Sequence, residues 1–150
     1  MATRSKTVLA RDTYLALVRA QDRLASQAAA LLKDHGLTTA TYNVLRILRG
    51  AGAEDLSCSD VGARLIHRVP DVTRLLDRME RDGWVRRERA SDDRRVVRTQ
   101  ITAAGRKAVD ALDGPVMELH AEQFAGLAVR EIEALEVALE RLAQPAPTGG

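Results

Sequence analysis

Two consecutive helical patterns within residues 57–82 constrain the fold of this 150-residue chain more than any other feature. The sharper pattern is the second, whose apolar residues are Val72, Leu75, Leu76 and Met79. Their spacing of i, i+3, i+4 and i+7 forms one apolar stripe on an α-helix. Pro70 suits the first turn of such a helix, and Gly83 suits the position just after its end. The sequence therefore predicts a helix over residues 70–82 that packs on a small core.

The opposite face of this predicted helix is polar. It carries Asp71, Thr73, Arg74, Asp77, Arg78 and Arg81. On an isolated helix, a solvated charged surface would explain such a face. The neighbouring segments favour a different interpretation.

A shorter helix is predicted immediately upstream. Ser57 and Asp60 have the spacing of a capping box, in which each side chain accepts a hydrogen bond from the backbone N–H of the other residue. The helix that it opens would carry Val61, Leu65 and Ile66. A tight connection over residues 67–70 would then lead into the second helix. This is the plan of a helix-turn-helix, whose second helix enters the major groove of DNA.

Two β-prone runs follow, at residues 84–89 and 96–101, and a polar turn separates them. Their arginines are Arg86, Arg87, Arg89, Arg94, Arg95 and Arg98. Against three acidic residues, these six leave a net charge of +3 over residues 84–98. A basic ribbon of this kind suits phosphate and the narrow minor groove. The predicted fold is thus mainly α with a small β-wing, a winged helix-turn-helix.

These motifs, in this order, resemble the multiple-antibiotic-resistance regulator (MarR) family. The resemblance rests on Leu37-Thr38, Tyr42, Leu45, Leu48, Val72-Thr73-Arg74-Leu75, Gly83-Trp84-Val85-Arg86-Arg87, Asp93-Arg94-Arg95 and Ile101-Thr102-Ala103-Ala104-Gly105. It implies a homodimeric, cytoplasmic transcription regulator, expected to be a repressor, that binds a pseudo-palindromic operator. It also implies release from DNA by a small aromatic or anionic ligand or by an oxidant.

Longer helical patterns flank the winged segment. A first helix is predicted over residues 8–33, a second over residues 39–49 with Thr38 as its cap, and a further helix after Thr102 with a kink at Gly114-Pro115. The last predicted helix follows Gly126. Its apolar seam is formed by Ala128, Ile132, Leu135, Leu139 and Leu142.

The predicted organisation has three parts. Residues 1–36 and 103–143 form a helical dimerisation region, residues 37–102 form the winged helix-turn-helix, and residues 144–150 form a disordered tail. Pairing within one chain would explain the last helix's apolar seam almost as well as dimerisation. We favour dimerisation because readers of DNA half-sites pair to gain affinity and register.

The distribution of charge agrees with a DNA partner. Residues 1–109 hold 21 Lys and Arg against 13 Asp and Glu, a net +8, whereas residues 110–150 hold 2 against 8, a net −6. The basic part is the part that would meet nucleic acid. The absence of an 18-residue apolar run and the single cysteine predict a cytoplasmic protein with no membrane contact.

The residues expected to contact DNA come from both helices, their connection and the wing. They are Ser57, Ser59, Arg68, Pro70, Asp71, Thr73, Arg74, Arg78, Asp93, Arg94 and Arg95. Arg74 is expected to read a base and Arg95 to enter the minor groove. By the family resemblance, Asp93 is expected to orient an arginine.

Other sites are predicted more weakly. The resemblance suggests an effector cleft lined by Tyr14, His35, Tyr42 and His67, although these residues also suit ordinary core and interface positions. Cys58 is interpreted either as a redox sensor at a helix N-terminus or, preferably, as a small, part-buried side chain. The sequence has no metal-ligand spacing, phosphate loop or catalytic arrangement, so we expect no metal, no cofactor and no enzyme activity.

A protein-interaction module that does not read DNA is the alternative function. Such a module would present an acidic or apolar face on the second helix. Arg74, Arg78 and the basic wing argue against it.

Overall fold

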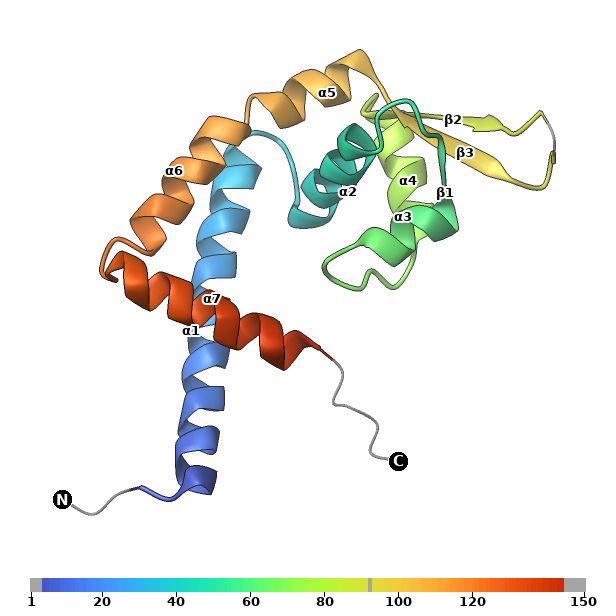
Figure 1. Ribbon diagram of the computed structural model, residues 1–150. Helices are drawn as coiled ribbons and strands as arrows, with labels where there is room; N and C mark the ends of the chain where they lie inside the picture. The colour runs from blue at the N-terminus through green and yellow to red at the C-terminus, as the bar shows by residue number, and fades with distance from the viewer. Residues whose placement is uncertain (1–3, 92, 145–150) are drawn as a thin grey trace, which may run out of the picture. The chain divides into compact units, whose positions relative to one another are not determined.

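The computed structural model describes residues 4–91 and 93–144. Within them, seven helices and three short strands follow one another in the order α1, α2, β1, α3, α4, β2, β3, α5, α6 and α7 (Figure 1). The chain divides into two compact units, and the first ends at Val116. No described helix is long and apolar enough to cross a membrane. The predicted fold class, mainly α with a small β-wing, is confirmed.

Helix α1 (Lys6–Asp34) begins after Ser5, whose side chain caps it, and ends before Gly36. Gly36 has a φ of 74°, the left-handed conformation that commonly terminates a helix. The predicted first helix is therefore confirmed. Only Leu32 is buried along its length. The large apolar side chains that remain exposed on α1 are Val8, Leu9, Tyr14, Leu15, Leu17 and Val18.

Helix α2 (Thr39–Gly50) supplies the centre of the core. Thr38 caps it, as predicted, and both Leu45 and Leu48 are buried, whereas Tyr42 is partly buried. Helix α2 packs against α5 (Ala103–Asp110), which starts at the predicted Thr102 cap.

Helix α3 (Cys58–Arg64) starts with the predicted capping box. Ser57 Oγ accepts from the Asp60 N–H at 3.1 Å, and the Asp60 carboxylate accepts from the Ser57 N–H at 2.9 Å. The helix is shorter than predicted, because Leu65 already has extended backbone and Ile66 lies beyond it, 74% exposed. Leu65 packs on the core although its backbone is extended. Its spacing of four residues from Val61 therefore led to the prediction of a longer helix. The connection between α3 and α4 spans residues 65–71 and is therefore longer than the predicted connection over residues 67–70.

Helix α4 (Val72–Arg81) begins two residues later than predicted. Asp71 is its N-cap and accepts a hydrogen bond from the Arg74 N–H at 2.9 Å, so Pro70 precedes the helix instead of lying in its first turn. A carboxylate cap satisfies a backbone N–H that would otherwise lack a partner. At the other end Gly83 has the expected left-handed φ, 81°.

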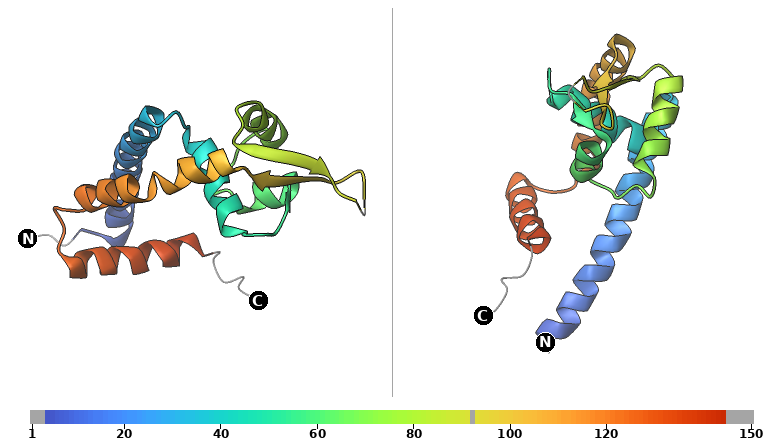
Figure 2. Two further views of the ribbon diagram at one scale, coloured as in Figure 1. Left: turned by 90° about the horizontal axis from the view of Figure 1, so that it is seen from above. Right: turned by 90° about the vertical axis from the view of Figure 1, so that its right-hand side faces the viewer.

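Strands β2 (Val85–Arg89) and β3 (Val97–Ile101) form the predicted antiparallel ribbon, with Val85 opposite Ile101. A strand that was not predicted, β1 (Leu56–Ser57), pairs with β3, so the sheet has three strands in the order β1-β3-β2. Two residues are too few to show the alternation by which a strand is recognised in a sequence. The ribbon projects beyond helices α2, α3 and α4 in both Figure 1 and Figure 2.

The break after α5 falls at Ala111–Leu112, so the predicted kink at Gly114-Pro115 is wrong. Both of those residues lie in the first turn of α6 (Asp113–Gln123). Proline is tolerated there because its missing N–H would have no intrahelical acceptor. Leu112 is completely buried and anchors the break in the core.

The second unit contains the rest of α6 and helix α7 (Val129–Ala143), which follows Gly126 as predicted. Of the predicted seam, Leu135, Leu139 and Leu142 are exposed and Ile132 is partly buried. The predicted disordered tail, residues 144–150, lies outside the described residues from position 145 onward.

Candidate nucleic-acid interface

Helix α4 separates an apolar face from a cationic one. Leu75, Leu76 and Met79 are buried, as the stripe predicted. On the other side Thr73, Arg74 and Arg78 are exposed. Within the described residues, neither the Arg74 nor the Arg78 guanidinium bonds to another part of the chain. Two cations are therefore available to an external partner.

Asp77, on the same face, already has a partner within the chain. The Asp77 carboxylate pairs with the guanidinium of Arg87, and the neighbouring Glu80 accepts from the Arg87 backbone N–H at 2.9 Å. The Arg87 side chain is only 12% exposed. These bonds fasten helix α4 to strand β2, and the pairing offsets the negative charge that Asp77 places beside Arg78.

The remaining wing arginines divide into tied and free groups. Arg86 pairs with Glu88 at 3.1 Å, Arg98 donates to the backbone carbonyl of Asp55 at 3.3 Å, and Arg89 donates to the carbonyl of Arg94 at 3.2 Å. The Arg94 guanidinium has no partner among the described residues. The structure thus leaves Arg94, in the turn, free to bind, whereas these three strand arginines are occupied.

Arg95 is held at the turn by Asp93. Asp93 Oδ1 accepts from the Arg95 backbone N–H at 3.0 Å and from its Nε at 3.3 Å. The expected pairing of Asp93 with an arginine is therefore present. The Arg95 side chain is nevertheless 92% exposed, so its outer nitrogens remain available to a partner.

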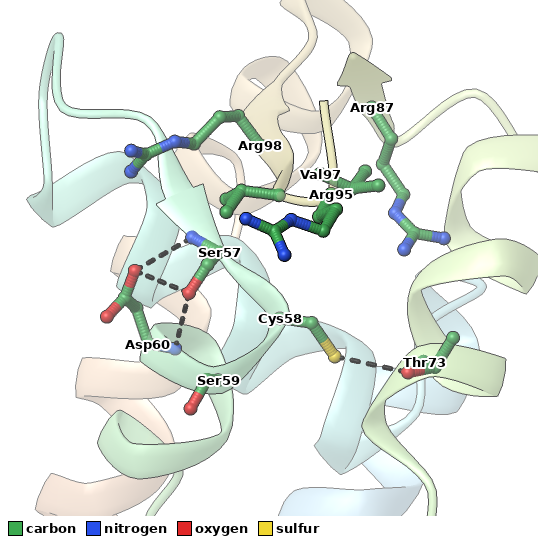
Figure 3. Close-up of a pocket in the computed structure, with 10 residues that line it drawn as sticks. Ser57, Cys58, Ser59, Asp60, Thr73, Arg87, Arg95, Val97 and Arg98 are labelled. Atoms are coloured by element: carbon green, nitrogen blue, oxygen red, sulfur yellow. Dashed lines mark hydrogen bonds between the residues drawn. The ribbon is translucent and has the colours of Figure 1, made fainter. Parts of the chain in front are cut away.

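A shallow groove lies between the starts of α3 and α4 and the wing (Figure 3). Its lining includes Ser57, Cys58, Ser59, Thr73, Arg87 and Arg95. Figure 3 shows Arg95 over the groove and the Cys58 Sγ directed at Thr73 Oγ1, 3.3 Å away. Cys58 is partly buried, which agrees with its interpretation as a small, part-buried side chain.

The serines at the start of α3 differ in what they can offer a phosphate. Ser57 Oγ donates its proton to Asp60 at 2.6 Å, and the hydrogen bonds from Ser57 hold the pKa of Asp60 below its ordinary range. A hydroxyl has one proton to donate, so the intact cap withholds that of Ser57. Ser59 is exposed, as are Arg68, Pro70 and Asp71 in the connection and cap before α4.

The four residues expected to line an effector cleft come from separate elements. Tyr14 lies on α1 and is 64% exposed, His35 follows α1 and contacts the Leu31 carbonyl at 3.0 Å, and His67 is exposed in the connection before α4. The guanidinium of Arg46 lies over the ring of Tyr42, which is on α2. The distance from the Arg46 Cζ to the ring centroid is 5.9 Å. Among the described residues, no hydrogen bond joins any two of the four, and no group of His, Cys, Asp and Glu side chains is arranged to hold a metal.

Comparison with known proteins agrees with this geometry. A model of the MarR family matches residues 35–96. A MarR transcription factor of known structure from Planctomyces limnophilus is 34% identical, with a TM-score of 0.70, over 95% of this chain and all of that one. The transcriptional repressor IacR of Pseudomonas putida is 28% identical over 83% of this chain and 73% of its own length.

A third similar protein is Bordetella bronchiseptica BpsR, whose structure describes the regulation of its DNA binding by 6-hydroxynicotinic acid. It is 25% identical, with a TM-score of 0.76, over 86% of this chain and 91% of that one.

Proposed function

This chain belongs to the MarR family of transcriptional regulators, and from that premise we propose that it represses transcription as a homodimer bound to a pseudo-palindromic operator. The observation that carries the proposal is the set of cations left free on two neighbouring elements. On α4 these are Arg74 and Arg78, and on the wing Arg94. Arg95 beside it bonds to Asp93 through Nε but keeps its outer nitrogens exposed. A helix with free arginines suits the major groove, and an arginine-tipped ribbon suits the adjacent minor groove.

The proposed homodimer is supported by apolar surface. Six large apolar side chains are exposed along α1, and five are exposed along α7. The five on α7 are Val129, Leu135, Val137, Leu139 and Leu142. Several large apolar side chains exposed along one helix are typical of an interaction surface. A second copy would also supply the second recognition helix that a pseudo-palindrome requires.

Arg95→Ala is expected to weaken operator binding by at least about tenfold, which corresponds to about 1.4 kcal/mol. The substitution removes a 92% exposed cation from the wing turn and no buried contact, so thermal stability should not change. The measurement is a titration at fixed salt with duplex DNA that the wild-type protein has selected from a random-sequence pool.

Arg106→Ala is the matched control, because Arg106 is exposed on α5, away from the groove, and its loss changes the net charge equally. Equal affinities of the Arg95 and Arg106 variants would refute the wing contact. Failure of the wild-type protein to select any DNA would refute the proposed function and would favour the protein-interaction alternative.

The proposal includes release from DNA by a small aromatic or anionic effector, as BpsR is regulated by 6-hydroxynicotinic acid. An effector that prefers the DNA-incompetent state a hundredfold would shift the equilibrium by about 2.7 kcal/mol. By reciprocity, it should raise the melting temperature of the free protein and lower operator affinity.

Thermal shift with a panel of aromatic acids and phenols, followed by titration of the hits against operator, measures both effects. A Tyr42→Leu variant tests the expected cleft, because it removes the phenolic ring and keeps an apolar side chain on α2. A compound that stabilises the protein without changing operator affinity would not be a regulatory effector.

A further inference from the structure

One arginine outside the DNA-facing surface binds the ends of two other helices. Arg49, in the last turn of α2, donates from Nη1 to Asp110 Oδ1 at 2.7 Å and to Asp113 Oδ2 at 2.8 Å, and from Nη2 to Asp113 Oδ1 at 2.9 Å. Its side chain is 24% exposed. The guanidinium therefore binds the Asp113 carboxylate through two hydrogen bonds. Such a bidentate pair fixes the relative orientation of the two groups as well as their distance.

The two aspartates flank the break between helices. Asp110 is the last residue of α5 and Asp113 is the first residue of α6. A cation near the ends of α2 and α5 and an anion at the start of α6 both complement the helix dipoles. The hydrogen bonds from Arg49 lower the pKa of Asp113. The same bonds raise the pKa of Arg49, and the bonds to Asp113 contribute more to this than the bond to Asp110. Three helix ends thus meet at one guanidinium.

The break is held from its other side by the core. Leu112, between the two aspartates, is completely buried, and Val109 before it is buried as well. The Val116 N–H donates to the Leu112 carbonyl at 2.9 Å, so the first turn of α6 continues directly from the anchored residue. The two-residue interruption is therefore held at two points within the first unit.

We propose that Arg49, Asp110 and Asp113 form a positioning junction that fixes the direction in which α6 leaves α5 and the wing. In the homodimer, on which this inference rests, that direction contributes to the separation of the two recognition helices. The separation matters because dimeric helix-turn-helix proteins bind half-sites about 34–36 Å apart, one turn of DNA. Arg49 therefore acts on operator recognition without touching DNA.

We expect that the junction can be removed without unfolding the protein. Both aspartates are more than half exposed, at 52% and 56% of their side-chain surface. Exposed ion pairs typically contribute about 0–1 kcal/mol because water and salt screen them, and a bidentate pair contributes somewhat more. The expected consequence of breaking the junction is a loss of geometry rather than a loss of fold.

The first test measures the distance between the two recognition helices in the free dimer. A spin label at Asp82→Cys, in a Cys58→Ser background, places one probe at the end of α4 in each protomer. Electron-spin distance measurements should give one narrow distribution for the parent and a shifted or broadened one for Arg49→Gln and Asp113→Asn. Light scattering and circular dichroism on the same samples establish that the variants remain dimeric and folded.

Arg46→Gln is the matched control. Arg46 lies one turn earlier on α2, is exposed and carries the same charge, but forms no hydrogen bond with either aspartate. Its distribution should equal that of the parent. Arg49→Lys keeps the charge and loses the bidentate geometry, so it should behave like Arg49→Gln and keeps the test valid if Arg49→Gln folds poorly.

The second test uses the selected operator and duplexes whose spacer is one base pair shorter or longer. The parent should prefer the selected spacer at least about tenfold, and Arg49→Gln should reduce that preference while retaining half-site binding. A variant that is merely less stable would lose affinity for all spacers alike. Unchanged distances in dimeric Arg49→Gln and Asp113→Asn would overturn the inference alone, whereas a monomeric parent would overturn the proposed homodimer and the inference with it.

Discussion

Arg74→Ala is expected to weaken operator binding by about 1–3 kcal/mol, or about 5- to 150-fold, with the loss concentrated at one base position. Arg74 lies near the leading end of α4, where recognition helices contact base edges, and its guanidinium has no partner among the described residues. The Asp71 cap bonds to the backbone N–H of residue 74, so alanine leaves the start of the helix intact.

The measurement compares wild type and variant on the selected operator and on its single-base substitutions. If Arg74 reads a guanine through two hydrogen bonds, the wild-type protein should discriminate at one position and the variant should not. Arg81→Ala is the control, because Arg81 lies in the last turn of the same helix and carries the same charge. An equal loss on every substituted operator would instead identify Arg74 as a phosphate contact.

The parts of this interface that were predictable from sequence are those determined within one or two turns of the chain. The capping box joins residues three apart, and the α4 stripe repeats every three or four residues, so both are visible without knowledge of the fold. The starts of α2, α3 and α5 follow from a single Ser or Thr side chain each. Local chemistry therefore fixed the recognition helix and the ribbon that follows it.

The distribution of free and occupied arginines could not be predicted in the same way. Arg87 bonds to Asp77 across the turn that follows α4, and Arg98 bonds to the carbonyl of Asp55, 43 positions away. These pairs exist only after the sheet has formed against the helices. Six arginines that look equivalent in the sequence consequently differ in their availability to DNA.

The break after α5 shows a related limit. Gly114-Pro115 is the strongest local signal for a kink, yet the chain breaks at Ala111–Leu112 because Leu112 is buried and Arg49 binds the aspartates on both sides. Arg49 lies 61 and 64 positions from those aspartates. A tertiary anchor thus outweighed a local preference, and only the structure reveals it.

Gly105→Ala is expected to destabilise the protein by about 1–3 kcal/mol or more, because it overpacks a closed site. Gly105 is buried in the first turn of α5, and a Cβ there would lie 2.3 Å from the Trp84 carbonyl oxygen, 3.0 Å from Ile101 Cγ1 and 3.1 Å from Leu45 Cδ2. The Trp84 carbonyl is held in place, since it accepts from the Thr102 backbone N–H at 3.1 Å, while the Thr102 hydroxyl donates to the neighbouring Gly83 carbonyl at 2.6 Å.

Gly62→Ala is the matched control for that substitution. Gly62 lies within α3, and the nearest atom to an added Cβ is Val72 Cγ2 at 3.4 Å, an ordinary van der Waals distance. In a helix interior, alanine is favoured over glycine by about 0.5–1 kcal/mol, so this variant should be equally or more stable than wild type. Urea unfolding followed by circular dichroism measures both changes as shifts of the midpoint. A Gly105→Ala midpoint at or above that of wild type would show that α5 can move away from Trp84, and the close packing of α5 on the base of the wing would then not be required for the fold.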